Sequence, residues 1–188
     1  MAQPSLSDLV VAAMVAPARC GCTRVVLVDG PAGSGKTTLA ERLGAALKTQ
    51  VLHADDMYEG WDGLPVLRDV LVKFILEPLS RGEQAGFERW DWAASARADR
   101  IEIPTGDVLV IEGVGVAQRA ARTYASLVIY VDAPWSERLA RGVARDGEAM
   151  RAQWEVWQYA EEEFLNAEDT LQAADIVVDG TLPVPDAW

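Results

Sequence analysis

A glycine-rich stretch near the start of the chain has the residue types and the spacing that bind phosphate. It lies between the apolar run Val25–Val28 and a helical pattern that begins near Thr37. Glycines let the backbone turn so that successive N–H groups point inward, where they meet the partial positive charge of a helix N-terminus. In this motif Lys36 would reach the β- and γ-phosphates of a triphosphate, and the Thr37 hydroxyl would ligate Mg²⁺. The alternative, a glycine-rich turn with a surface lysine, does not account for the strand before it and the helix after it. The residues predicted to bind the nucleotide are Gly30, Ala32, Gly33, Ser34, Gly35, Lys36, Thr37, Thr38 and, near the C-terminus, Gly180.

Acidic residues follow two of the predicted strands. Asp55 and Asp56 come directly after the run Val51–Ala54, and Glu112 comes directly after Val108–Ile111. A carboxylate at a strand end that faces a phosphate loop can accept a proton from a hydroxyl or organise Mg²⁺. We therefore predict a functional role for at least one of the two aspartates and a metal-binding role for Glu112. The alternative is that these carboxylates only cap a turn or bond a neighbouring loop.

Arginines recur on one face of a predicted helix. Arg138, Arg141 and Arg145 are spaced by three and four residues, and Arg151 follows after a short break. Guanidinium groups suit a bidentate grip on phosphate because they are planar and always charged. An ordinary solvated basic face would have the same pattern, and Arg141 and Arg145 are the strongest candidates for phosphate binding.

Tryptophans stand beside carboxylates in two places. Trp61-Asp62-Gly63 and Trp90-Asp91-Trp92 can stack a flat ring and bond sugar hydroxyls, although tryptophans also fill cores. The only histidine, His53, lies within a strand, and its position favours a packed residue over a catalyst.

The elements that must position these residues alternate along the chain. Continuous apolar runs indicate strands that are covered on both faces, as in a mostly parallel sheet with helices on each side. The predicted fold is an α/β three-layer sandwich around a five-stranded sheet, with ligands at the carboxyl ends of the strands. The predicted strands are Val25–Val28, Val51–Ala54, Val108–Ile111, Leu127–Val131 and Ile176–Val178, and the predicted helices are Thr37–Leu47, Val66–Leu79, Ser136–Val143 and about Ala149–Leu165.

Length and charge restrict the class of protein. The 188 residues predict a single domain, with an N-terminal helix and lead-in over 1–22. The formal charge of −12 disfavours polymeric nucleic acid as a partner, because such a surface repels phosphates.

The apolar segment Leu6–Ala16 contains Asp8, follows no basic residue and is too short to span a membrane. The two cysteines, Cys20 and Cys22, are predicted to be thiols in a reducing cytosol, so we expect a cytoplasmic protein. A homo-oligomer is left open.

With these residues assembled, the chain resembles the uridine kinase-like branch of the phosphate-loop kinases over nearly its whole length. The loop is specific to a superfamily, and the other motifs are specific only in combination. The residues that carry the resemblance are Gly30–Thr38, Asp55-Asp56-Met57-Tyr58, Trp90-Asp91-Trp92, Val110-Ile111-Glu112-Gly113, Val131-Asp132, Arg138-Leu139, Arg141 and Arg145-Asp146.

The resemblance implies an enzyme that moves the γ-phosphoryl group of ATP to a hydroxyl of a small molecule, with ATP and Mg²⁺ as cofactors. It implies that Asp55 is the general base, that Arg141 and Arg145 belong to a lid over about 138–151, and that Lys36 completes the catalytic set. The implied metal ligands are Thr37, Asp55 and Glu112, and the implied acceptor residues are Asp55, Tyr58, Trp90, Asp91 and Ser95.

One departure from the family concerns the acceptor. Ser95 stands where the resembling kinases carry a histidine that contacts the base, so we expect uridine and cytidine to be poor acceptors. A nucleoside-like acceptor is favoured, and a non-nucleoside alcohol is the alternative. A nucleotide-dependent switch or ATPase is the rival from another class. The chain has neither the Asn/Thr-Lys-x-Asp segment of guanine-specific switches nor the Leu-Ser-Gly-Gly-Gln run of transporter ATPases.

Overall fold

The computed structural model describes residues 3–186, and its centre is a parallel sheet of five strands. The strands run in the order β2 (Val51–His53), β5 (Val108–Glu112), β1 (Arg24–Asp29), β6 (Ala125–Asp132) and β7 (Ile176–Asp179). All four neighbouring pairs are parallel. The five strands predicted from apolar runs are therefore confirmed, as is the parallel α/β class.

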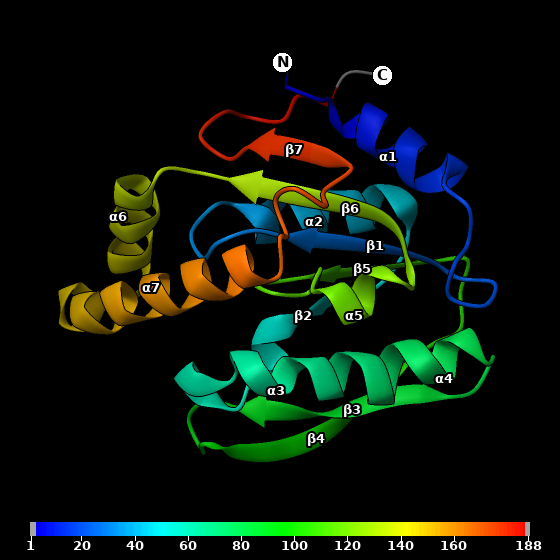
Figure 1. Cartoon of the computed structure of the whole chain (residues 1–188), viewed down its shortest axis with the longest axis horizontal. Helices are drawn as coiled ribbons and strands as arrows, with labels where there is room; N and C mark the ends of the chain where they lie inside the picture. Colours follow the sequence, from blue (N-terminus) through cyan, green and yellow to red (C-terminus); the bar gives the residue numbers. More distant parts are fainter. Residues whose placement is uncertain (1–2, 187–188) are drawn as a thin grey trace.

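Helices cover both faces of the sheet, as Figure 1 shows. In β1 the side chains alternate, so that Val26 and Val28 pack with α1 (Leu6–Val15) and α2 (Lys36–Leu47). Val25 and Leu27 point to the other face and pack in the second core cluster. Because both faces are buried, the strands contain hydrophobic residues without interruption, and this explains the continuous apolar runs.

The second face is covered mainly by one long helical segment. It consists of α3 (Leu64–Asp69), a π-helical stretch η3 (Val70–Leu76) and α4 (Glu77–Ser80), which follow one another without a break. The sequence predicts a single helix over Val66–Leu79, and the structure places the segment there with a wider central turn. The short helices α5 (Arg119–Arg122), η1 (Ala54–Asp56) and η2 (Gly60–Asp62) connect the elements around it.

A two-stranded antiparallel hairpin was not predicted. It is formed by β3 (Ala85–Asp91) and β4 (Ala96–Ile103) and packs beside the long helical segment. In β4 most side chains are exposed and several are charged, so the strand lacks the apolar run that marks the central strands. A search for continuous hydrophobicity does not detect such a strand.

Two helices lie at the carboxyl ends of the strands. They are α6 (Trp135–Asp146) and α7 (Arg151–Ala167), joined by Gly147 and the short helix η4 (Glu148–Met150). The aromatic ring of Trp154 lies against Gly142, where a larger side chain would collide with it. The helices therefore pack closely at the edge of the sheet where parallel α/β proteins bind their ligands.

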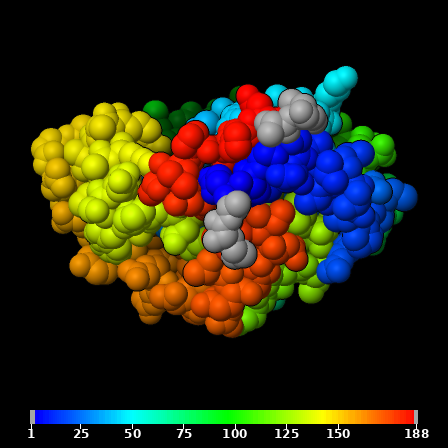
Figure 2. Space-filling model, turned by 90° about the horizontal axis from the view of Figure 1, so that it is seen from above, coloured from blue at the N-terminus to red at the C-terminus, as the bar shows by residue number. Residues whose placement is uncertain are grey.

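The two ends of the described chain lie together. Figure 2 shows the first helix beside the C-terminal segment on one face of the molecule. The backbone N–H of Leu6 donates to the carbonyl of Pro185 at 2.8 Å, and Arg42 of α2 pairs with Asp186 at 2.5 Å. None of the helices between residues 3 and 186 is long and apolar enough to cross a membrane.

Candidate active site

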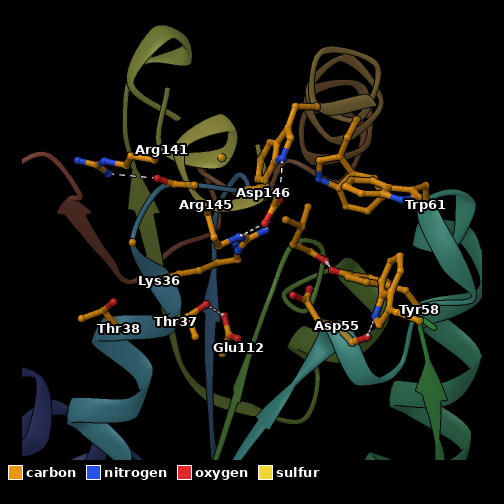
Figure 3. Close-up of a pocket in the computed structure, with 18 residues that line it drawn as sticks. Lys36, Thr37, Thr38, Asp55, Tyr58, Trp61, Glu112, Arg141, Arg145 and Asp146 are labelled. Carbon is orange, nitrogen blue, oxygen red and sulfur yellow. Dashed lines mark hydrogen bonds and ion pairs between the residues drawn. The ribbon is translucent and has the colours of Figure 1, made fainter. Parts of the chain in front are cut away.

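A cavity of about 340 Å³ opens where the strands end, between the phosphate loop, α6 and α7 (Figure 3). It combines residues from distant parts of the sequence, because the carboxyl ends of parallel strands meet at one edge of the sheet. Its lining residues are Ala32, Gly33, Gly35, Lys36, Thr37, Thr38, Asp55, Tyr58, Trp61, Trp92, Glu112, Val114, Arg141, Gly142, Arg145, Asp146, Trp154 and Trp157.

The glycine-rich stretch forms the loop between β1 and α2 that the sequence predicts. Gly35 has φ = 99° at the N-cap of α2, a left-handed conformation that favours glycine. Gly33 has φ = 78°, and a β-carbon there would collide with the backbone of Arg138. The loop can therefore wind tightly around a phosphate group while it touches α6.

Three residues predicted to bind the nucleotide, two of them within the loop itself, are not among the residues that line the cavity. Gly30 packs against the backbone of Val131, and a β-carbon would collide there. Gly180 approaches the carbonyl of Ser34 so closely that only glycine fits. The Ser34 side chain is itself fully buried. These three residues support the backbone of the loop, and their part in nucleotide binding stays a prediction.

Lys36 and Thr37 lie at the start of α2 and face the cavity. Lys36 is 8% exposed, and its ammonium lies 3.4 Å from the carbonyl of Pro31. The Thr37 hydroxyl donates to Oε2 of Glu112 at 3.2 Å, and Oε1 of Glu112 lies 2.7 Å from Nδ1 of His53. The bond to Glu112 raises the pKa of His53. His53 thus fixes the orientation of the Glu112 carboxylate, a supporting role that the sequence analysis did not assign.

Asp55 and Asp56 are distinguished by their positions. The first lies on η1 and opens onto the cavity, whereas the second is not among the lining residues. Partial desolvation by the cavity walls raises the pKa of Asp55, although Lys36 counteracts the increase. Glu112 adds to the increase because it carries the same charge.

One side of the cavity is built from rings. We call Tyr58, Trp61, Trp92, Val114 and Trp157 the aromatic half. Edge-to-face contacts join its rings in a row: centroids are 5.7 Å apart for Tyr58–Trp157, 5.7 Å for Trp157–Trp61 and 5.8 Å for Trp61–Trp92. The Tyr58 hydroxyl donates to the carbonyl of Val114 at 2.5 Å, and the Trp92 indole donates to the carbonyl of Asp55 at 2.8 Å.

The structure places three predicted acceptor residues outside this cavity lining. Trp90 lies in β3 beneath the guanidinium of Arg97, whose central carbon is 5.6 Å from the ring centroid. Asp91 accepts bonds from Ala93 and Ala94 and so closes the hairpin turn, where Ser95 has φ = 50°. The turn directs Trp92, not its neighbours, to the cavity.

Arg141 and Arg145, the two arginines predicted to bind phosphate, both line the cavity from α6. Both already form hydrogen bonds within the protein. Arg141 donates to the carbonyls of Gly33 and Gly180 at 3.1 Å each. Arg145 forms two bonds to Asp146, at 2.7 and 2.9 Å, and lies over the ring of Trp154. The indole of Trp154 also donates to Asp146, at 2.9 Å.

Two fully buried carboxylates hold the phosphate loop from behind. Asp29 accepts bonds from the backbone N–H groups of Gly30, Gly115 and Ala117, at 2.6 to 2.8 Å. Burial raises the pKa of Asp29 to about 6. Glu161 of α7 accepts the N–H of Ala32 at 2.8 Å and pairs with Arg138 of α6 at 2.6 Å.

Sequence reasoning named Tyr58, Trp61 and Trp92 but missed these two carboxylates and the other two members of the aromatic half, Val114 and Trp157. A signal existed for α7, because Trp154, Trp157 and Glu161 are spaced by three and four residues and share one helix face. No comparable pattern marks Asp29 or Val114, since their roles depend on how the strands meet.

The assembled groups suit the transfer of a phosphoryl group. The loop amides and Lys36 can hold a polyphosphate, and the Thr37–Glu112 pair can share a divalent cation. Asp55 lies on the opposite side of the cavity, beside the aromatic half, where it can receive a proton.

Comparison with known proteins agrees with this architecture. The family model described as "AAA domain" matches residues 26–170. A shikimate kinase from Corynebacterium diphtheriae is 32% identical over 119 residues, 62% of this chain, and the match spans only 61% of that protein. A cytidylate kinase from Ignicoccus hospitalis is 27% identical over 181 residues, covering 87% of this chain and 93% of that one.

Among solved structures, a possible uridine kinase from Bacillus stearothermophilus superposes with a TM-score of 0.68 at 23% identity. The match covers 93% of this chain and 97% of that one, and it establishes the P-loop kinase fold. Because the family model covers well over half of the sequence, this chain belongs to the AAA domain family.

Proposed function

We propose that this protein transfers the γ-phosphoryl group of ATP to a hydroxyl of a small, nucleoside-like molecule. The observation that carries the proposal is the position of Asp55. Its carboxylate opens onto the same cavity as Lys36, yet it lies beside the aromatic half, where a second molecule fits next to the phosphates. A non-nucleoside alcohol is the alternative acceptor.

The phosphate side of the cavity supplies charge and orientation. Loop amides and Lys36 would hold the β- and γ-phosphates, and Arg141 and Arg145 would stabilise the charge of the transferred group from α6. Because α6 is followed by Gly147, which has φ = 95°, the segment over about 138–151 could close as a lid.

The residues present fit Mg²⁺. This ion prefers a few carboxylate or hydroxyl oxygens together with phosphate and water, and Glu112 and Thr37 supply one of each. Among residues 3–186 no cluster of three or more acidic, histidine or cysteine side chains could hold a metal alone, so the nucleotide would complete the site. When bound, the ion would neutralise phosphate charge, with Asp55 as a further ligand or a neighbour of the ion.

In the proposed reaction the acceptor oxygen bonds to the γ-phosphorus, and the bond from that phosphorus to the β–γ bridging oxygen breaks. ADP leaves, and the hydroxyl proton passes to Asp55. A base works best when its pKa lies near the operating pH, and desolvation moves the pKa of Asp55 in that direction.

Replacement of the two neighbouring aspartates tests this role. We expect Asp55→Asn to lower kcat by about 10²–10⁴, the range for a positioned general base, with little change in ATP affinity. Asp56→Asn is the matched control, because Asp56 is not in the cavity lining. Equal losses in both variants, or a loss only in Asp56→Asn, would contradict the assignment.

The rival function is a nucleotide-dependent ATPase or switch without an acceptor. It predicts ADP release that added alcohols do not change. Acceptor-dependent ADP release, measured with purified protein, separates the two.

A further inference from the structure

Arg141 and Arg145 reach the cavity from the same helix but are held in different ways. The carbonyls of Gly33 and Gly180 accept hydrogen bonds from Arg141, so backbone fixes that guanidinium. Between residues 3 and 186 the hydrogen bonds of Arg145 all go to one neighbouring side chain, Asp146. The Arg145 side chain is also 68% exposed, and a long exposed side chain has many rotamers open to it. Its direction therefore depends on what holds Asp146.

The direction of Arg145 matters because its charge faces the place where a phosphoryl group would pass. In Figure 3 its guanidinium lies between Asp146 and Lys36. Desolvation raises the pKa of Asp55, and the charges of Lys36 and Arg145 both counteract the increase. The two cations thus act on the proposed general base from the side of the phosphate loop, where the transferred group would lie.

Asp146 is held by a second residue, Trp154 of α7. Its two oxygens accept hydrogen bonds from Arg145 at 2.7 and 2.9 Å, and Oδ2 also accepts the indole N–H of Trp154 at 2.9 Å. The bonds from Arg145 and Trp154 lower the pKa of Asp146, so this carboxylate is charged at neutral pH. The indole bond spans the turn at Gly147 and η4, and it connects the end of α6 with α7.

Packing fixes the ring of Trp154. The residue is 2% exposed, and the guanidinium carbon of Arg145 lies 5.4 Å from its ring centroid. A β-carbon at Gly142 would lie only 2.4 Å from the ring, so glycine is what allows the ring to approach α6. Glycine weakens the interior of a helix, and here it permits a contact that no larger residue allows.

Stability of α6 does not account for this arrangement. Asp146 is the last residue of the helix, where the macrodipole opposes a negative charge. Its pair with Arg145 is largely exposed, and such pairs contribute little to the stability of a fold. The contacts around Asp146 therefore direct a side chain more than they stabilise the fold.

From this geometry we propose that Trp154 is a positioning residue, which acts through Asp146 to hold the guanidinium of Arg145 toward Asp55 before the substrates bind. This rests on the proposed function, in which Arg145 stabilises the charge of the transferred group. A charge that is already in place needs no reorganisation in the transition state. Trp154 thus raises kcat without contacting the reacting atoms.

Replacement by phenylalanine tests the role of the indole N–H. Trp154→Phe keeps a ring beside Gly142 but has no donor for Asp146. We expect kcat to fall about tenfold, since a displacement of about 1 Å can cost about 10²-fold in rate. KM for ATP and for the acceptor should change by less than about twofold, because binding contacts remain. Asp146→Asn should give the same pattern. Tyr159→Phe is the control, because Tyr159 is exposed on α7 and lies outside the cavity lining.

The competing explanation is direct contact with a substrate, because Trp154 itself lines the cavity. A double variant separates the two. If Trp154 acts through Arg145, adding Trp154→Phe to Arg145→Met lowers kcat no further than Arg145→Met alone. A further loss in the double variant, or a raised KM with unchanged kcat in Trp154→Phe, would overturn the proposal.

A measurement without turnover tests the positioning itself. The heteronuclear NOE of the Arg145 Nε–H group, assigned with Arg145→Met, reports its order on the picosecond-to-nanosecond timescale. We expect an ordered group in the wild type and in Tyr159→Phe, and a mobile one in Trp154→Phe and Asp146→Asn. A group that is mobile in the wild type, or equally ordered in Trp154→Phe, would overturn the proposal. If no alcohol stimulates ADP release by the wild type, the kinase function is wrong, and the NOE still decides whether Trp154 holds Arg145.

Discussion

Asp29 connects the phosphate loop with the opposite wall of the cavity. Its oxygens accept N–H groups from Gly30 in the loop and from Gly115 and Ala117 after β5. The same segment contains Val114, whose carbonyl accepts the Tyr58 hydroxyl. One carboxylate therefore aligns the nucleotide side and the aromatic half.

Burial raises the pKa of Asp29 from 3.8 to about 6, so the folded protein binds a proton more tightly than the unfolded chain. This tighter binding of the proton contributes about 3 kcal/mol to the free energy of unfolding. The contribution is fully present below about pH 4 and is lost as the pH rises through 6. The Asn variant lacks this titration. We expect the melting temperature of the wild type, relative to Asp29→Asn, to fall between pH 4 and 6 and to stay level above pH 7. A difference independent of pH would contradict the raised pKa.

At the residue scale, the sequence identifies the side chains that can do chemistry, but it does not always predict which of them face the cavity. Lys36, Thr37, Asp55 and Glu112 reach the cavity because motif and strand end fix their place. The backbone turn after β3 decides instead that Trp92 faces the cavity and Trp90 does not, and no spacing rule predicts such a turn.

At the scale of elements, α6 and α7 are joined to the phosphate loop by one buried ion pair. Arg138 and Glu161 are 6% and 0% exposed, and the second oxygen of Glu161 holds the N–H of Ala32. Movement of the two helices would therefore pull on the loop.

This link can be tested by separating stability from nucleotide binding. Glu161→Leu leaves the buried Arg138 charge without its counter-charge, although Nε still donates to the carbonyl of Ala133, and such a change costs about 3–5 kcal/mol. The double variant Arg138→Met with Glu161→Leu removes both charges and should recover much of the stability, measured by thermal unfolding. ATP binding should remain weakened in both variants, because the bond to Ala32 is absent in both. Full recovery of ATP affinity in the double variant would show that the pair only stabilises the fold. Exposed Glu162 supplies the control, Glu162→Leu.

The central strands were predictable because burial on both faces leaves unbroken apolar runs. The principal helices were predictable because their apolar residues recur at helical spacing. The hairpin β3–β4 was not, since its outer strand is largely exposed and gains its place by pairing with β3. The hairpin that brings Trp92 to the cavity is thus the element that a search for apolar runs does not find.

At the scale of the whole molecule, the N-terminal helix closes one face of the sandwich. Leu6, Leu9 and Ala13 are buried in the core cluster that includes α2, while Val11 and Val15 are exposed. The N-terminal helix that the sequence analysis predicts is thus present, and it packs against α2, β1 and β6. The contact with the C-terminal segment ties both ends of the described chain to the same face.

Leu9→Ala should therefore destabilise the protein by about 2–5 kcal/mol, the cost of a cavity in a packed core. For a chain of this size that corresponds to a fall of about 5–15 °C in melting temperature. Val11→Ala is the matched control on the exposed side of the same helix and should change little. Similar losses in both variants would mean that the helix packs differently.

The most direct test of the kinase account measures acceptor-dependent ADP release and identifies the phosphorylated product by mass spectrometry, for the wild type and Lys36→Ala. Lys36 is the first residue of α2, directly after the phosphate loop, where its charge can meet the β- and γ-phosphates. We predict that a small-molecule alcohol, of the nucleoside-like kind proposed above, stimulates ADP release by the wild type and gains one phosphoryl group. The Lys36→Ala variant should keep its melting temperature and lose this activity. Wild-type phosphoryl transfer by Lys36→Ala, or no stimulation of the wild type by any alcohol tested, would contradict the account.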